Sequence, residues 1–202
     1  MTTPRLAAAL SMAVFVVVAG PGPARAAGPL DDPAFVKVIT CAACHGTNGN
    51  SKSDMMPTIA GLAPAYFKRQ VENYATGKRP SPEMEAYAKE IQFLGLDQIA
   101  AYFAAQRREP TPVRASADAA ARGKVIAAQC VICHGQDGRG DATRLIPGLA
   151  GQPPGYLAQQ MAIFKVDTRD PGEPLLAAKK ALMRIIPDSQ FADLAAYYSS
   201  LR

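Results

Sequence analysis

Two clusters of cysteine and histidine constrain the fold of this chain more than any other feature of its sequence. They lie in TCAACHGTNGN, residues 40–50, and QCVICHGQDGRG, residues 129–140, and each contains Cys-x-x-Cys-His followed by glycine. Together they hold all 4 Cys and both His residues of the chain. A pattern that appears twice and uses up both residue types indicates two copies of one small unit, each organised around its own cluster.

Other segments repeat in the same order. PTIAGLAPAYFKRQ, from Pro57, parallels PGLAGQPPGYLAQQ, from Pro147, and LDQIAAYFAAQ, from Leu96, parallels FADLAAYYSSL, from Phe191. A chain of 202 residues suits two such domains of roughly 75–90 residues. The predicted organisation is a signal peptide, a first domain, a linker with two prolines and a second domain, at 1–26, 27–108, 109–116 and 117–202.

The secondary structure is predicted to be all-α, because alternating Val, Ile and Thr runs are essentially absent. In each unit we expect a helix into the first Cys, a glycine-rich loop, a helix after the repeated proline, a proline-bearing loop and a terminal helix. The helices are expected at about 33–41, 64–76 and from 96 in the first unit, and at 117–130, 154–164 and 189–201 in the second. Aromatic residues are 7% of the chain and Trp is absent, so each thin core would gain from a metal, a disulfide or a buried cofactor.

The first residues have the pattern of a secretory signal peptide. Arg5 precedes the almost wholly apolar stretch 6–19, and Ala24-Arg25-Ala26 is a small-x-small cleavage site. The alternative is an uncleaved anchor, but the apolar stretch is shorter than the roughly 20 residues of a spanning helix. We therefore expect an exported, periplasmic protein that begins near Ala27.

The charge pattern argues against binding to nucleic acid. Removal of the predicted leader takes away two arginines and lowers the formal charge from +5 to about +3. No basic run interleaved with aromatic residues remains. The pairs Lys78-Arg79, Arg107-Arg108 and Lys179-Lys180 are expected to be exposed, where they would steer encounters with a protein partner or serve solubility alone.

The Cys-x-x-Cys-His pattern is the attachment signature of c-type haem. Each thiol can add to one vinyl group of the porphyrin, and the adjacent imidazole then lies under the iron. Three alternatives have weaker support: a zinc site would have to combine both clusters, a thioredoxin-like redox pair needs a strand and helix context, and the cysteines of an exported chain can form structural disulfides. The predicted cofactors are two covalently bound haems c.

With these motifs, the sequence resembles the dihaem class I cytochromes c, most closely the cytochrome c4 family. The resemblance covers nearly the whole mature chain and implies two tandem class I cytochrome c domains related by internal duplication. It implies that the haems are attached at Cys41 and Cys44, and at Cys130 and Cys133, with His45 and His134 as proximal iron ligands. It also implies that the carbonyls of Pro57 and Pro147 accept hydrogen bonds from these imidazoles; the alternative is that both are ordinary loop prolines.

The sixth iron ligand of such cytochromes is a methionine sulfur, and in the first unit Met84 has the register of the family. It lies seven residues before Ile91 and eighteen before Tyr102. Met55 and Met56 are rivals, but they lie between the histidine and Pro57, on the proximal side. We therefore predict Met84 as the sixth ligand of the first haem.

The second unit departs from this register. Eighteen residues before Tyr197 stands Lys179, and Met183 follows one helical turn later. Met183 is the predicted ligand, on the assumption that a shorter loop presents its sulfur from the same side. Lys179 as a neutral amine and an open iron position are the alternatives.

The resemblance implies an electron carrier rather than an enzyme, since both histidines serve as ligands and no recognisable catalytic constellation remains. It would relay single electrons between a dehydrogenase or membrane respiratory complex and a terminal oxidase or reductase. One alternative is a dihaem oxidoreductase, such as a sulfur-compound dehydrogenase, with chemistry at the second haem. Another is the cytochrome subunit of a larger dehydrogenase.

Overall fold

The computed structural model describes residues 31–166, 169 and 174–202, so the predicted signal peptide, 1–26, lies outside the described residues. In these ranges the regular structure is helical, with one isolated bridge between Asp141 and Ile146. The predicted all-α class is confirmed. No helix in the described part of the chain is long and apolar enough to cross a membrane.

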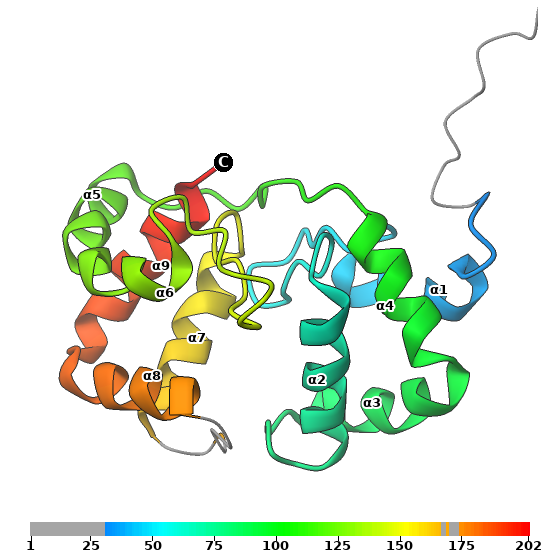
Figure 1. The fold of residues 1–202 in the computed structure, drawn as a ribbon. Helices are drawn as coiled ribbons and strands as arrows, with labels where there is room; N and C mark the ends of the chain where they lie inside the picture. Colours follow the sequence, from blue (N-terminus) through cyan, green and yellow to red (C-terminus); the bar gives the residue numbers. More distant parts are fainter. Residues whose placement is uncertain (1–30, 167–168, 170–173) are drawn as a thin grey trace, which may run out of the picture.

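The helices form two lobes joined by an extended segment (Figure 1). The first lobe contains α1 Phe35–His45, α2 Pro64–Ala75, α3 Pro82–Leu94 and α4 Leu96–Ala105. The second contains α5 Ala117–Ile126, η2 Ala127–Gln129, α6 Val131–His134, α7 Pro154–Lys165, α8 Pro174–Ile185, η3 Asp188–Gln190 and α9 Phe191–Ser200.

Proline residues explain where α2 and α7 begin. Pro64 and Pro154 occupy the first turns of α2 and α7, where a residue without an N–H loses no helical hydrogen bond. The helices predicted at 64–76 and 154–164 therefore agree with α2 and α7 to within a residue at each end. The 117–130 prediction was less accurate, because this segment divides into α5 and η2 before α6.

The sequence predicts a proline-bearing loop before each terminal helix. This prediction is wrong, because the helices α3 and α8 occupy these segments. In the first unit, the Ser81 hydroxyl caps the helix by accepting from the Met84 N–H at 3.3 Å, and Pro82 follows in the first turn. Proline therefore starts this helix instead of breaking it. Met84 lies in the first turn of α3.

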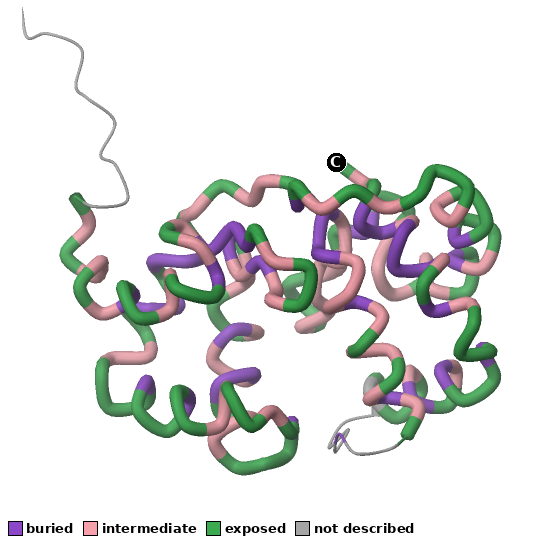
Figure 2. The backbone as a smooth tube through the Cα atoms, turned by 180° about the vertical axis from the view of Figure 1, so that it is seen from behind, coloured by how far each residue is buried: buried purple, intermediate pink, exposed green. Residues whose placement is uncertain are grey.

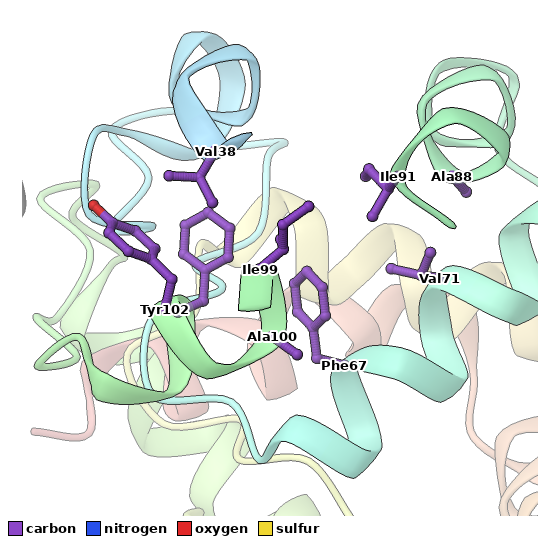
Figure 3. Close-up of a cluster of buried hydrophobic side chains, with 9 residues drawn as sticks. Val38, Phe67, Val71, Ala88, Ile91, Ile99, Ala100 and Tyr102 are labelled. Atoms are coloured by element: carbon purple, nitrogen blue, oxygen red, sulfur yellow. The ribbon is translucent and has the colours of Figure 1, made fainter. Parts of the chain in front are cut away.

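Each lobe has its own apolar core. The first core, whose side chains are drawn as sticks in Figure 3, consists of Val38, Phe67, Val71, Ala88, Ile91, Ile99, Ala100, Tyr102 and Phe103. The second consists of Ala127, Leu157, Phe164, Met183, Ile186, Phe191, Leu194, Ala195 and Tyr198. Figure 2 shows buried segments in both lobes and exposed outer turns. Two separate cores are what an internal duplication requires, although the predicted domain limits stay predictions.

The segment between the lobes is hydrogen-bonded to both of them. The Glu109 N–H donates to the Asn50 side chain of the first lobe at 2.8 Å. The Thr111 N–H donates to the Gly151 carbonyl of the second lobe at 3.0 Å. Thr111 is also buried. These contacts hold the linker against both units.

Four residues at repeat-related positions join the units through a buried polar network. Arg79 and Arg169 are 90 residues apart, and each is 5% exposed. Arg79 donates to Oε1 of Gln70 and of Gln160, at 2.9 Å in both cases. Arg169 donates to the same two oxygens, at 2.6 and 3.2 Å. Each glutamine oxygen therefore accepts from one arginine of its own unit and one of the other.

This network contradicts part of the prediction that the basic pairs of the sequence are exposed. Arg79 was expected on the surface but is buried between the units, and Lys180 is only 6% exposed. Lys78 and Arg107 are exposed as expected. A pair of adjacent cations in the sequence therefore does not identify a docking patch, because one member can be the buried partner of polar groups.

Candidate haem sites

The first cluster lies at the C-terminal end of α1. Cys41, Cys44 and His45 are at positions i, i+3 and i+4 of one helix, and this spacing places them on one face. Gly46 ends the helix with φ 78°, and a Cβ at this position would lie 2.4 Å from the Asn50 carbonyl oxygen. Glycine at this position therefore lets the chain turn sharply after the histidine.

The His45 ring is oriented by the backbone of the loop that follows. Its Nδ1 lies 2.8 Å from the Pro57 carbonyl oxygen. Because a carbonyl can only accept, Nδ1 carries the hydrogen, and Nε2 keeps its lone pair. This tautomer and orientation are those of a metal-ligating histidine with a carbonyl partner.

The second cluster repeats this arrangement at the end of α6. His134 Nδ1 lies 3.1 Å from the Pro147 carbonyl oxygen. Gly135 follows with φ 75°. The contacts that the family resemblance implied for the two prolines are thus present in both units, which is the specific arrangement that an ordinary loop proline would not require.

Burial sets the protonation states in both clusters. It lowers the pKa of His45, against the effect of the Pro57 carbonyl. The pKa of His134 falls to about 4, first through burial and then through the charge of Lys179. Both imidazoles are therefore neutral near pH 7, the form that binds a metal. Burial likewise raises the pKa of the Cys41 and Cys130 thiols.

The donor set of each cluster fits haem c. All four cysteines have free thiols, and each histidine has one nitrogen held by a carbonyl and one available. Cys41, Cys44 and His45 would hold one haem, and Cys130, Cys133 and His134 the other. A bound haem supplies a one-electron iron couple. Within the described ranges, no group of three His, Cys, Asp or Glu side chains converges as a zinc site would require.

The predicted sixth ligands occupy different environments. Met84 is half-buried in the first turn of α3 and is not part of the first core. Met183 is 3% exposed and belongs to the second core. Lys179, one turn earlier in α8, places its Nζ 3.7 Å from the centre of the Phe164 ring. Burial lowers the pKa of Lys179 to about 7, and the charges of Arg169 and Arg79 act in the same direction. Ligation by Met84 or Met183 stays a prediction.

Sequence reasoning missed two contacts between the units. In each of them, a side chain of one unit binds the backbone of the residue that follows the histidine-bound proline of the other unit. Gln152 forms two hydrogen bonds with the backbone of Thr58, the residue after Pro57. Arg108 donates to the carbonyl of Gly148, the residue after Pro147, at 3.3 Å. One signal was available: Gln152 stands where the repeat has apolar Leu62 in the first unit.

Comparisons with known proteins agree with this geometry. The family model described as Cytochrome c matches residues 120–202. Cytochrome c4 of Pseudomonas aeruginosa is 37% identical over 141 residues, which cover 66% of this chain and 70% of that protein.

Two solved structures are similar over most of the chain. The crystal structure of reduced recombinant cytochrome c4 from Pseudomonas stutzeri has a TM-score of 0.75 at 25% identity, and the match covers 84% of this chain and 97% of that one. The thiosulfate dehydrogenase from Marichromatium purpuratum has a TM-score of 0.70 at 32% identity. That match covers 79% of this chain but only 36% of the dehydrogenase chain.

The fold and the two clusters define a protein of two tandem class I cytochrome c domains. Each domain of this class carries one covalently bound haem c. The chain belongs to the cytochrome c4 family, whose members are dihaem electron carriers.

Proposed function

We propose that this chain is an exported, periplasmic carrier that relays single electrons between a dehydrogenase or membrane respiratory complex and a terminal oxidase or reductase. The proposal rests mainly on the duplicated His–Pro contact, at 2.8 Å in the first unit and 3.1 Å in the second. Two neutral, oriented imidazoles beside two pairs of free thiols supply what two haems c need from the chain. The leader pattern at 1–26 supports export.

The roles of individual residues follow from this arrangement. The thiols would fix the haems, the imidazoles would be proximal iron ligands, and the proline carbonyls would set the orientation and basicity of the imidazoles. Met84 would complete the coordination of the first iron, and a His/Met pair raises the reduction potential. Met183 is the residue that the sequence proposes for the second iron.

The contact between the units supports an internal relay. The linker is hydrogen-bonded to both lobes, and the four-residue Arg–Gln network joins them in a buried environment. Fixed centres need no domain motion between one electron and the next. Partner proteins would then meet one unit each, through the small and brief interfaces that electron carriers use.

The stoichiometry of haem and of electrons tests the proposal. In the exported holoprotein, the pyridine haemochrome assay should give two covalently bound haems per chain, and a reductive titration should take up two electrons. The variant Cys130→Ala/Cys133→Ala should retain one haem, attached to the first cluster. One haem in the wild-type protein, or haem that acid acetone extracts, would contradict the proposal.

A second candidate is the cytochrome subunit or electron-accepting partner of a sulfur-compound dehydrogenase. The similarity to part of a thiosulfate dehydrogenase chain favours it, and so does the departure of the second unit from the methionine register. Stable copurification with a second polypeptide would support it. If the isolated chain oxidises thiosulfate with an artificial acceptor, the protein is an enzyme rather than a carrier.

A further inference from the structure

The structure assigns Lys179 and Met183 to different roles once the two units are compared residue by residue. In the first unit, Met84 stands seven residues before Ile91, and in the second the same step back from Ile186 leads to Lys179. Ile91 and Ile186 are 6% and 3% exposed, and each belongs to the core of its unit. Counted back from the core isoleucine, Lys179 therefore has the register of Met84, although it lies in the second turn of α8 and Met84 in the first turn of α3.

Met183 corresponds instead to a residue of the core. It lies four residues after Lys179, as Ala88 lies four residues after Met84. Ala88 is fully buried in the first core, and Met183 is 3% exposed in the second. A flexible thioether fills irregular space in apolar surroundings well. The position and burial of Met183 are thus explained by packing.

The amine of Lys179 points inward. Its Nζ is 3.7 Å from the centre of the Phe164 ring, which is 1% exposed. Phe164 belongs to the second core, and Cys130 of the second cluster packs against the same core, so the amine lies on the side of the unit that carries this cluster. No carboxylate among the described residues forms an ion pair with it.

We propose that Lys179, and not Met183, supplies the sixth ligand of the second haem. This inference rests on the proposed function only in requiring that a haem is attached at the second cluster. Only a neutral amine could bind iron, so Lys179 would have to release its ammonium proton to solvent before its nitrogen could serve as the ligand. The step changes no oxidation state.

The two units would then differ in reduction potential. A methionine ligand raises the potential of a His-ligated haem, and the first unit keeps that methionine. An amine nitrogen favours ferric iron more than a thioether does, so the second haem would have the lower potential. Electrons would enter at the second unit and leave from the first, which gives the relay a direction.

Optical and paramagnetic resonance spectra of the oxidised, full-length holoprotein test the assignment. Bonding of sulfur to ferric haem gives a weak far-red absorption band, and we expect one equivalent of it for two haems. Lys179→Met should double the band, because the second unit regains the ligand type of the first. Lys179→Ala should remove one of the two wild-type low-spin ferric signals. Met183→Leu, which keeps the core filled, should leave both spectra unchanged, as should the exposed control Lys124→Met.

Two results would contradict the assignment of Lys179 as the ligand. Two equivalents of the far-red band in the wild type that fall to one in Met183→Leu would overturn the proposal, and so would wild-type spectra in both Lys179 variants. Haem content is measured on the same samples. One haem per chain would refute the proposed function, whereas two haems with a sulfur ligand on each would refute only the role of Lys179.

Discussion

The Gln152 side chain forms two hydrogen bonds with the backbone of Thr58. The Thr58 N–H donates to Oε1 at 2.9 Å, and Nε2 donates to the Thr58 carbonyl at 2.7 Å. Both residues are buried, and they are 94 positions apart in the chain. Because Thr58 directly follows Pro57, a residue of the second unit holds the peptide that orients His45 in the first.

The variant Gln152→Leu tests this brace. It installs the residue type found at the equivalent position of the first unit, but it leaves the buried N–H and C=O of Thr58 without partners. We expect the free energy of unfolding to fall by about 2–4 kcal/mol. A less firmly held Pro57 carbonyl should also weaken its hydrogen bond to His45, reduce the basicity of the imidazole and raise the potential of the first haem.

Denaturant unfolding and a redox titration of the holoprotein measure the two effects. The exposed Gln92→Leu is the matched control and should change neither quantity. Equal shifts of both haem potentials, or a stability like that of the control, would show that Gln152 does not act through Thr58.

A second prediction concerns the network between the units. Gln70→Leu removes the oxygen that accepts from Arg79 at 2.9 Å and from Arg169 at 2.6 Å. Each guanidinium then keeps only Gln160 among the two shared acceptors. Hydrogen bonds to charged groups are typically worth about 1.5–3 kcal/mol, so we expect a loss of stability of at least that order.

Non-additivity distinguishes a network from two independent contacts. Gln70→Leu combined with Gln160→Leu should destabilise the protein by an amount that differs from the sum of the single effects by about 0.5–3 kcal/mol. Strict additivity in urea unfolding would mean that the two glutamines act separately.

The sequence predicted correctly those features that depend only on neighbouring residues in the chain. The two clusters are contiguous, and Pro64 and Pro154 mark helix starts without reference to the rest of the chain. It failed for the segments of α3 and α8, because a proline can end one helix or open another, and the choice in α3 depends on the Ser81 cap. The contacts of Arg79 could not be predicted from the sequence, because Gln160 is 81 residues away from it and only folding brings the two side chains together.

The ion pair between Arg122 and Asp193 predicts a pH dependence. The guanidinium donates two hydrogen bonds to the carboxylate, at 2.8 and 2.7 Å, and these lower the pKa of Asp193. A carboxyl whose folded-state pKa is lowered stabilises the protein above its unfolded pKa, about 3.9 for Asp, and loses that effect as the pH falls through the folded value.

Acid unfolding of Asp193→Asn measures this contribution. The variant should lose less stability than the wild type between pH 7 and the acid range, because Asn cannot be protonated there. The control Gln92→Leu is exposed and changes no ionisable group, so it should follow the wild-type profile. Identical acid profiles for the Asp193→Asn and wild-type proteins would contradict the prediction.

The close approach of α5 to α9 at Gly123 predicts a strong effect of one added methyl group. Gly123 in α5 faces α9, and a Cβ there would lie 1.9 Å from the Asp193 carbonyl oxygen and 2.9 Å from the Tyr197 Cβ. The obstacle at 1.9 Å is backbone, so a rotamer change cannot relieve it and the two helices must separate. Alanine is the better helix former, yet Gly123→Ala should cost about 1–3 kcal/mol, as overpacking typically does. Thermal unfolding checks this against Lys124→Ala, an exposed substitution on the same helix. If Gly123→Ala matches or exceeds that control in stability, α5 and α9 do not approach as closely as the glycine contact requires.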